Sequence, residues 1–519
     1  MSGNQSVDDA EEQRAIVAFL SQASTYGPGV KDVTRYETHG SIVFLAGRRA
    51  YKLKRAVRFP YMDYSTRALR HQMCLRELAV NRRTAPELYL DVLPIVRDEH
   101  GALQFGTNAE DRSAMDWVVV MRRFDQENLL EKVAETGGLT REMTAQLAQS
   151  IAEFHHAAEI TPEFGGAARV REIIAENAAI FRAADGPFRS AMIDRYERES
   201  LGLLGKLAPV LDKRQRDGHV RRCHGDLHLN NIVMLANRPV LFDAIEFNDA
   251  FACIDVLYDL AFLLMDLDRH GARDHANTIL NRYLEIANEH DGLAALPLFL
   301  SCLAAIRAHT AVAKAKAVGC SNSEDSQMAN ALLDAAVSYL DPVRPRLVAI
   351  GGVSGTGKST VARRLAPLLG VTPGAIVIRS DVLRKQLLGV AQTVRLPSSA
   401  YAPEVTQNVY ARMAELASAV LASGYSVIAD AVHGNLMEQT AIEEVARIAG
   451  VRFDGIWLDA PAEILESRIR LRQGDASDAT VDVLRAQRRS VVQPQRWIQV
   501  SASGSESENF ENARRVLAD

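Results

Sequence analysis

The stretch LVAIGGVSGTGKST, residues 347–360, decides the fold of the last third of the chain. An apolar run of strand type leads into a glycine-rich turn, and a helix-forming segment follows. The spacing G-x-x-x-x-G-K-S is that of a phosphate loop, whose fixed positions are Gly352, Gly357, Lys358 and Ser359. Backbone N–H groups of such a turn point at phosphate oxygens, the lysine reaches the terminal phosphates, and the serine hydroxyl offers a ligand to magnesium. The other loop positions expected to contact a nucleotide are Gly355, Thr356 and Thr360.

Apolar segments alternate with helix-forming segments in this part of the chain. The four strand candidates are residues 347–351, 375–379, 425–430 and 455–460. Such alternation predicts an α/β domain with a mainly parallel sheet. The two prolines of DPVRPR, residues 341–346, interrupt the preceding helical region. We therefore expect the phosphate-loop domain to span residues 346–519.

A second motif of phosphoryl-transfer type lies upstream. It consists of CHGDLHLNNIVM, residues 223–234, and LFDAIEF, residues 241–247. Asp226 precedes Asn231 by five residues, and Asp243 follows on a strand-like segment. Phosphoryl transfer needs a base that orients the acceptor hydroxyl and oxygen ligands that hold magnesium against the triphosphate. Each residue taken singly could cap a helix or lie in a loop, but together they indicate a catalytic site.

This motif resembles the catalytic loop and metal-binding aspartate of the protein-kinase-like fold, in its aminoglycoside phosphotransferase branch. In that branch a histidine-glycine-aspartate sequence replaces histidine-arginine-aspartate. The resemblance implies that Asp226 is the base, that Asn231 and Asp243 are magnesium ligands, and that Glu246 assists them. It also implies an α+β bilobal domain over residues 1–341, with a small lobe at about 25–125 and a large lobe at about 126–341.

The small lobe should supply a lysine that faces the phosphates. The alternating pattern of residues 30–57 predicts antiparallel strands, and in AYKLKR the side chains of Lys52 and Lys54 share one face. Either could serve; Lys52 best matches the family position, and Glu77 is the candidate partner. The alternative is a solvated basic strand edge with an exposed helix glutamate. No G-x-G-x-x-G loop precedes Lys52, which argues against a protein kinase.

Further polar residues follow the strand candidates of the downstream domain. Asp381 lies just beyond one strand, and Arg384 lies one helical turn later. We expect Asp381 to act as a base and Arg384 to hold an anionic substrate group, although helix capping is the alternative. Asp430 ends the strand of residues 425–430, where a second carboxylate that organises magnesium belongs.

Arg468 and Arg472 are four residues apart and share one helix face. They resemble an arginine-bearing lid that closes over nucleotide phosphates, and a salt-bridged surface helix is the alternative. The downstream domain as a whole resembles phosphate-loop kinases such as polynucleotide kinase, gluconate kinase and zeta-toxin-like enzymes. It departs from them at Glu438 and Gln439, where related domains often carry an arginine, so substrate recognition on that side is left open.

Composition bounds the class of protein. The net charge of -5 gives no broad basic surface of the kind that a duplex nucleic-acid binder shows. The N-terminus lacks the positive start and apolar run of a secretory signal. The most apolar stretch, residues 296–306, is too short to span a bilayer. Five scattered cysteines without C-x-x-C spacing fit a reducing cytoplasm.

Over most of its length the chain resembles bacterial two-part proteins in which an aminoglycoside phosphotransferase-like domain is fused to a phosphate-loop kinase domain. The resemblance implies a cytoplasmic bifunctional kinase that uses ATP and Mg2+. Each half would phosphorylate a hydroxyl of a small metabolite of the sugar, amino sugar or polyol type. No membrane partner is expected, nucleic acid is disfavoured, and the oligomeric state is open.

Three alternatives remain. One half could be a nucleotide sensor that gates the other, the downstream half could phosphorylate nucleic-acid 5′-hydroxyl ends, or the upstream half could inactivate aminoglycosides. The last would need an acidic pocket for a cationic substrate. Acids that could line it, or could simply cap or solvate helices, are Asp255, Asp259, Asp266 and Asp268.

Overall fold

The structure is a computed structural model that describes residues 5–111, 113–184, 188–318, 323–471 and 477–518. The chain divides into two compact units. The first contains residues 1–166 and 214–266, and the second contains residues 167–213 and 267–519.

The first unit is built on an antiparallel six-stranded sheet in the order β1-β2-β3-β8-β6-β7. This confirms the antiparallel strands expected near its N-terminus. Its strands are β1 (Val33–Glu37), β2 (Ser41–Ala46), β3 (Arg49–Lys54), β6 (Tyr89–Arg97), β7 (Leu103–Phe105) and β8 (Asp116–Arg122), with a small hairpin β4 (Arg58–Phe59) and β5 (Met62–Asp63). Its first helices are α1 (Gln5–Leu20), α2 (Arg67–Asn81), α3 (Leu130–Glu135) and α4 (Arg141–Ala157).

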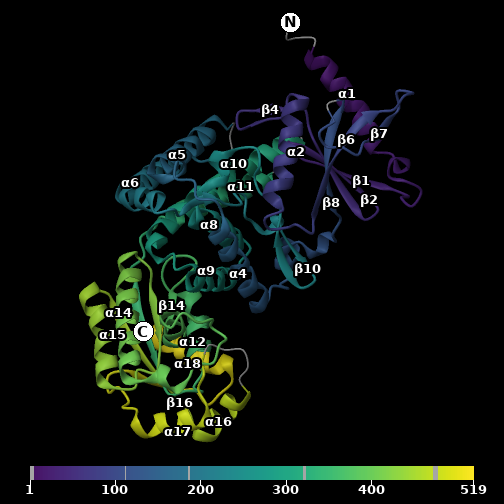
Figure 1. The fold of residues 1–519 in the computed structure, drawn as a ribbon. Helices are drawn as coiled ribbons and strands as arrows, with labels where there is room; N and C mark the ends of the chain where they lie inside the picture. Colours follow the sequence, from purple (N-terminus) through teal and green to yellow (C-terminus); the bar gives the residue numbers. More distant parts are fainter. Residues whose placement is uncertain (1–4, 112, 185–187, 319–322, 472–476, 519) are drawn as a thin grey trace. The chain divides into compact units, whose positions relative to one another are not determined.

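Strand β8 shows why this sheet is buried on both faces. Val118 and Val120 lie in one apolar core with residues of α1, whereas Trp117 and Val119 lie in another with Cys74 of α2. Side chains alternate across a strand, so an uninterrupted apolar run fits a strand covered on both sides. Helices α1 and α2 therefore lie against opposite faces of the sheet (Figure 1).

The upstream motif lies on short elements that follow α4. The strand pairs are β9 (Val220–Arg222) with β12 (Cys253–Asp255), and β10 (Ile232–Leu235) with β11 (Arg238–Leu241). Helix α7 (Asp249–Ala252) precedes β12, and α8 (Val256–Arg269) follows it. The loop of residues 223–231 therefore lies between β9 and β10. The segment of residues 242–248 lies between β11 and α7. Thr140 caps the N-terminus of α4, since its hydroxyl accepts from Met143 N at 3.2 Å.

The second unit contains a five-stranded parallel sheet in the order β14-β15-β13-β16-β17. The strands are β13 (Arg346–Gly351), β14 (Ile376–Arg379), β15 (Val427–Asp430), β16 (Arg452–Asp459) and β17 (Ile498–Ser501). The four expected strands are present. The fifth, β17, was not expected from the sequence. It is an edge strand with one buried residue in the pattern exposed, exposed, buried, exposed, so it lacks an apolar run.

Helices surround this sheet (Figure 1). They are α12 (Lys358–Leu365), α13 (Ser380–Leu387), α14 (Pro403–Ala422), α15 (Leu436–Ala449), α16 (Ala462–Leu471), α17 (Val481–Ser490) and α18 (Glu506–Ala518). The unit also contains α5 (Gly166–Ala183), most of α6 (Ser190–Arg216), α9 (Arg273–Ala287), α10 (Leu296–Val318) and α11 (Ser323–Ser338). The described residues between 273 and 338 are thus mainly helical.

Within the part of the chain that the structure describes, one helical segment, His290–Ala313, is long and apolar enough to cross a membrane by length and composition alone, with a mean hydropathy of 1.5. The expected apolar stretch of residues 296–306 therefore belongs to a longer helix, and the expectation that it is too short was wrong. Its burial is the informative observation, because 67% of the window is enclosed by the structure, as in the core helix of a soluble protein.

Candidate functional site

The upstream site brings together residues that lie far apart in the sequence. Lys52 Nζ on β3 lies 2.8 Å from Glu77 Oε1 on α2 and 2.6 Å from Asp243 Oδ1. Glu77 is fully buried, whereas 42% of the Asp243 side chain is exposed. The expected pairing of Lys52 with Glu77 is therefore present, and it extends to Asp243.

Lys54 also contacts Glu77, from the next position on the same face of β3. Its Nζ lies 2.7 Å from Glu77 Oε2 and 2.5 Å from Glu246 Oε1. Tyr64 OH donates to the same Glu246 oxygen at 2.6 Å. The carboxylate of Glu77 thus receives one ammonium group on each oxygen, and the alternative of a solvated strand edge does not describe these lysines.

The charges of this cluster stabilise each other. Burial lowers the pKa of Lys52, but Asp243 and Glu77 outweigh it and raise that pKa well above its usual value. Burial raises the pKa of Glu77, yet Lys52 and Lys54 together bring it down to about 2. Opposite charges at short range favour the ionised forms. The cluster is therefore charged at neutral pH.

Asp226 and Asn231 lie together in the loop that precedes β10. Asn231 Nδ2 donates to the backbone oxygen and to Oδ2 of Asp226, both at 2.9 Å. His228 Nε2 lies 3.3 Å from Asp226 Oδ2. Because Asp226 uses the amide nitrogen, the amide oxygen of Asn231 is the atom suited to a cation.

The backbone at Asp243 is unusual. Its φ of 63° lies in the left-handed region, which non-glycine residues seldom adopt. Its N–H donates to Tyr89 OH at 3.2 Å, and the next N–H, of Ala244, donates to Asn81 Oδ1 at 2.8 Å. Such a conformation persists where surrounding contacts enforce it, and such residues cluster at functional sites.

Helix α8 anchors the loop through two aspartates spaced seven residues apart. Asp259 accepts from Gly225 N at 2.8 Å, from His224 N at 3.1 Å and from His155 Nε2 at 3.0 Å. Asp266 accepts from Leu229 N at 3.1 Å. Both acids were candidates for a cationic-substrate pocket, but both are buried and engaged with the backbone. Asp255 is likewise paired with Arg214 at 2.8 Å.

In the second unit, two glycines of the phosphate loop lie where a Cβ would come too close to backbone oxygen atoms. Gly352 has φ 138°, and a Cβ there would lie 2.5 Å from Leu458 O. Gly355 has φ 89°, and its Cβ would lie 2.9 Å from Leu465 O. Gly357 ends the loop at the start of α12. The close approaches explain the glycines at 352 and 355, and a φ of 85° explains the glycine at 357.

The expected magnesium-organising pair is in contact. Ser359 Oγ donates to Asp430 Oδ2 at 2.5 Å, and Arg379 Nε lies 3.5 Å from the same oxygen. Lys358 Nζ donates to Val353 O at 3.1 Å, so its ammonium lies over the loop. Arg379 was not singled out from the sequence. Thr356 is buried, and both its hydroxyl and its N–H donate to Val353 O, at 2.9 Å and 3.4 Å, so its contact with a nucleotide stays a prediction.

Asp381 lies in the first turn of α13, near this pair. Burial is the main cause that raises the pKa of Asp381; Arg379 opposes the shift and Asp430 adds to it. A raised carboxylate pKa suits a proton acceptor at neutral pH. Arg384 is buried, donates to Ala400 O at 2.8 Å and lies over the ring of Tyr401. Its guanidinium is engaged within its own unit, and its role in substrate binding stays a prediction.

The lid arginines are described in part. Arg468 donates to Ala502 O and Gly504 O, both at 2.7 Å, so it ties α16 to the segment after β17. Arg472 lies outside the described residues. A residue that the sequence did not indicate, Gln487 of α17, accepts from Ser354 N of the phosphate loop at 2.8 Å.

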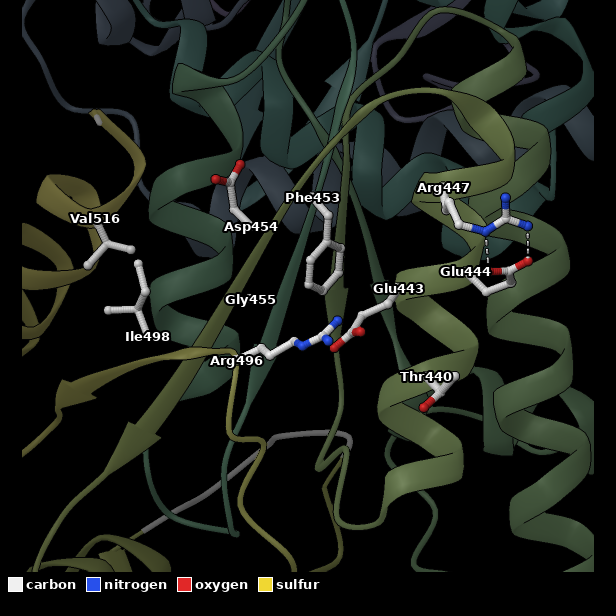
Figure 2. Close-up of a pocket in the computed structure, with 10 residues that line it drawn as sticks. All are labelled: Thr440, Glu443, Glu444, Arg447, Phe453, Asp454, Gly455, Arg496, Ile498 and Val516. Carbon is white, nitrogen blue, oxygen red and sulfur yellow. Dashed lines mark hydrogen bonds and ion pairs between the residues drawn. The ribbon is translucent and has the colours of Figure 1, made fainter.

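A cavity of about 500 Å3 lies elsewhere in the second unit (Figure 2). Phe453 and Gly455 contribute to it from the start of β16, level with the start of β13, whereas the phosphate loop follows the end of β13. None of the expected site residues lines it. The lining residues are Thr440, Glu443, Glu444, Arg447, Phe453, Asp454, Gly455, Arg496, Ile498 and Val516.

Comparisons with known proteins match two separate parts of the chain. Residues 57–296 match the model of the phosphotransferase enzyme family, and residues 347–494 match the model of an AAA domain. Three mycobacterial proteins, each described as uncharacterized, are 29% identical over 463 residues, which are 87% of this chain and 88% of each relative. They are Mb2027c of Mycobacterium bovis and MT2060 and Rv2004c of Mycobacterium tuberculosis.

Two solved structures are similar to parts of the chain. A choline/ethanolamine kinase family protein from Mesorhizobium loti is 13% identical, with a TM-score of 0.37, over 63% of this chain and 99% of its own. A gluconokinase from Sinorhizobium meliloti is 22% identical, with a TM-score of 0.25, over 34% of this chain and 93% of its own. At these scores neither likeness bears on the reaction.

The first family match contains Glu77, Asp226 and Asp243 of the upstream site but begins after Lys52, and the second contains the phosphate loop around Lys358. The chain is therefore an ATP-dependent phosphotransferase that carries a domain of the phosphotransferase enzyme family followed by a phosphate-loop domain of the AAA type.

Proposed function

We propose that the chain is a cytoplasmic bifunctional small-molecule kinase, in which each domain transfers the γ-phosphate of ATP to a hydroxyl of a sugar-like, amino-sugar-like or polyol-like metabolite. One observation carries the proposal: each unit separately assembles a cation, a carboxylate base candidate and oxygen ligands suited to magnesium. These are Lys52, Asp226 and Asp243 in the first unit, and Lys358, Asp381 and Asp430 in the second.

In the first unit, Asp226 would accept the proton of the acceptor hydroxyl as that oxygen bonds to the γ-phosphorus and the bond to ADP breaks. Asn231 and His228 orient the carboxylate. Lys52 would pair with phosphate oxygens while Glu77 keeps its ammonium in place. Positioning and charge neutralisation supply most of the catalysis in this class of reaction.

In the second unit, Asp381 would accept the acceptor's proton, and its raised pKa suits that role. The loop N–H groups and Lys358 would bind the β- and γ-phosphates. Arg379 lies beside Asp430 and adds a positive charge at the end of the sheet where the phosphates would lie. This unit thus has its own route to phosphoryl transfer.

Both sites fit Mg2+ by the chemistry of their donors. The candidate ligands are oxygens: the Asp243 carboxylate and Asn231 amide in the first unit, and the Ser359 hydroxyl and Asp430 carboxylate in the second. Hard divalent cations prefer such donors. When bound, magnesium would neutralise charge on the phosphates.

A second candidate function follows from Arg384. The residue expected to hold an anionic substrate is buried and hydrogen-bonded within the second unit. If no acceptor site forms there, this unit would bind ATP as a sensor and gate the first. The sensor hypothesis and the two-kinase hypothesis differ in what Asp381 does.

The test is ATP consumption by the purified chain over a panel of sugars, amino sugars, polyols, nucleosides, aminoglycosides and 5′-hydroxyl oligonucleotides, with products identified by mass. The variants are Asp226→Asn and Asp381→Asn. Matched controls are Glu99→Gln in the first unit and Asp482→Asn in the second, since 87% and 93% of these side chains are exposed.

The two-kinase proposal requires each site variant to remove a different phosphorylated product, with both controls active. If Asp381→Asn leaves every product unchanged while Lys358→Ala changes their rate, the second unit is a sensor. Products confined to aminoglycosides or oligonucleotides would replace the metabolite hypothesis.

A further inference from the structure

The upstream site contains more charge than phosphate binding requires. Lys52 already supplies a cation, and Glu77 already orients it. Lys54 and Glu246 form a second pair behind them, and their side chains are 1% and 6% exposed. They do not reach solvent, so they are not a surface ion pair, and their burial calls for another explanation.

We propose that Lys54 and Glu246 are positioning residues: they fix the turn at Asp243 and the carboxylate of Glu77, and so prepare the site for magnesium and ATP. The inference rests on the proposed kinase function of the first unit and names two residues that act through others. It assigns to Glu246 contact with Lys54 and Tyr64, not with the metal.

The geometry supports two linked functions. Asp243 and Glu246 are three residues apart, and each is bound by a lysine of β3, Lys52 at 2.6 Å and Lys54 at 2.5 Å. Strand β3 therefore holds this short segment at two points. A one-point contact would let the segment rotate about it, whereas two contacts fix its orientation. The left-handed φ of Asp243 is the conformation that such contacts must maintain.

The second function concerns Glu77. Its two oxygens bind different ammonium groups, with Lys52 at 2.8 Å and Lys54 at 2.7 Å. Without Lys54, one buried carboxylate oxygen would lose its partner, and Glu77 could turn both oxygens toward Lys52. That would hold the ammonium away from phosphates. Lys54 thus holds one oxygen of Glu77, so that Lys52 pairs with the other oxygen alone.

Stability alone is a weak explanation for this pair. Buried ion pairs seldom stabilise a protein more than an apolar pair of similar volume, because desolvation offsets the attraction. Tyr64 OH also donates to Glu246 at 2.6 Å, so a third buried polar group finds its hydrogen-bond partner in this network. A network of this kind specifies one arrangement of its members when every member is paired.

The same lobe provides a matched control. Arg70 of α2 pairs with Asp116 of β8 at 2.9 Å, and their side chains are 2% and 0% exposed. This pair links α2 to the sheet that contains β3, and its burial is similar to that of Lys54 and Glu246. Asp116 also accepts from Gln13 Nε2 at 3.2 Å, and Arg70 donates to Tyr64 O. Arg70 and Asp116 thus contact the backbone of Tyr64 and, through Gln13, the backbone of Lys54, whereas the contacts described for this pair include neither Asp243 nor Lys52.

The experiment uses the full chain with Lys358→Ala, so that nucleotide binding reports on the first unit. The test variant is Lys54→Met with Glu246→Gln, which removes both charges together. The control variant is Arg70→Met with Asp116→Asn. Calorimetric ATP titrations at several Mg2+ concentrations give the half-saturating Mg2+, and thermal unfolding gives the stability of each variant.

We expect the test variant to raise the half-saturating Mg2+ on the order of tenfold, as loss of groups that orient metal ligands does. The control should lose comparable stability with no change in the Mg2+ requirement. Lys54→Arg, which keeps the charge, should recover most of the Mg2+ affinity.

Equal Mg2+ requirements in the test and control variants would overturn the inference. If the double substitution fails to fold, the same titrations compare Tyr64→Phe with the parent. The half-saturating Mg2+ should then rise by less than tenfold. No rise in Tyr64→Phe would count against the proposal. If the parent itself binds no MgATP and Lys52→Met changes nothing, the proposed function of the first unit fails, and the inference fails with it.

Discussion

Lys52 Nζ lies 2.6 Å from Asp243 Oδ1, so the ammonium expected to face the phosphates neutralises the carboxylate expected to bind magnesium. Each group would have to leave the other when MgATP binds. Glu77 retains contact with Lys52 at 2.8 Å, so the lysine would exchange one partner and keep the second. Metal and nucleotide binding are thereby linked, because phosphate that attracts Lys52 releases Asp243.

Lys52→Met tests this link. The substitution should tighten binding of Mn2+, as a probe for Mg2+, in the absence of nucleotide, because Asp243 loses its competing cation. It should also weaken ATP binding, each effect on the order of tenfold. Glu77 keeps Lys54 as its partner, which limits the structural damage. Paramagnetic titration of Mn2+ in the Lys358→Ala chain measures the first effect, and calorimetry measures the second.

Lys132→Met is the control, since 48% of this side chain is exposed and it pairs locally with Glu135. Its Mn2+ and ATP affinities should match those of the parent. Unchanged Mn2+ binding in Lys52→Met would show that the contact with Asp243 does not compete with the metal.

Asp259→Ala should separate catalysis from nucleotide binding. It removes the acceptor of two backbone N–H groups, His224 and Gly225, and of His155. Buried donors without an acceptor cost about 1–3 kcal/mol each, so we expect a loss of about 3 kcal/mol or more. Asp226 follows directly, so kcat should fall much further than ATP affinity.

Asp255→Ala is the matched comparison, because Asp255 is also buried but pairs with Arg214. It should lose similar stability in urea unfolding and keep the kcat of the fraction that stays folded. A parallel loss of kcat in both variants would mean that stability, not loop position, explains the effect of Asp259.

Local patterns in the sequence predicted much of this architecture. The phosphate loop and four of the five parallel strands could be read directly, because each is a contiguous run with its own glycine or apolar pattern. Strand β17 could not, since its Ile498 is exposed and only Val500 is buried. An edge strand pairs on one side and needs no apolar run.

The site was predictable to the extent that a motif places residues close in sequence. The period of a strand put Lys52 and Lys54 on one face, and Glu77 was a candidate partner. That both lysines share Glu77 depends on how α2 packs, which strand periodicity does not determine. Asp259 and Asp266 were visible as acids, but their role as loop anchors depends on contacts more than 30 residues away in the chain.

Gly352→Ala should abolish nucleotide binding in the second unit. A Cβ at this position would lie 2.5 Å from Leu458 O, a backbone atom that cannot move without shifting β16. The φ of 138° adds strain, which is worth about 1–3 kcal/mol. ATP titration in a Lys52→Met background, where the first unit binds weakly, measures the loss.

Gly205→Ala provides the comparison. A Cβ added at this position of α6 would meet no atom within 4 Å, so the variant should bind ATP normally and gain about 1 kcal/mol of helix stability. Normal ATP binding by Gly352→Ala would mean that the loop adopts another path around phosphate.

Stability should fall as the pH decreases from 7 to 5, and His433 should account for part of the decrease. This histidine is fully buried, with ring centroids 5.7 Å from Tyr410 and 5.1 Å from Trp497. Burial lowers the pKa of His433 to about 4, below the usual value of about 6.5 in an unfolded chain. Between these values the unfolded chain takes up a proton that the folded chain does not, so the free energy of unfolding decreases as the pH falls.

The expected size follows from the shift. From pH 7 to pH 5, His433 should lower the free energy of unfolding by about 2 kcal/mol. Above the pKa of the unfolded chain, the folded protein keeps the whole of this stabilisation. Burial also lowers the pKa of His290 and of His309 to about 4, so wild type should lose more than one histidine's share. Glu77, with its pKa of about 2, should not add to this decrease, because the stabilisation that its ionised form provides is lost only below about pH 4.5.

His433→Phe should reduce the difference in unfolding free energy between pH 7 and pH 5 by about 2 kcal/mol. Urea unfolding followed by tryptophan fluorescence measures it, because Trp457 and Trp497 lie in the same unit. His100→Phe, at a side chain that is 82% exposed, should leave the difference unchanged. If His433→Phe keeps the full pH dependence of wild type, then His433 takes up its proton as readily in the folded chain as in the unfolded one, and the acid sensitivity of this unit must come from other groups.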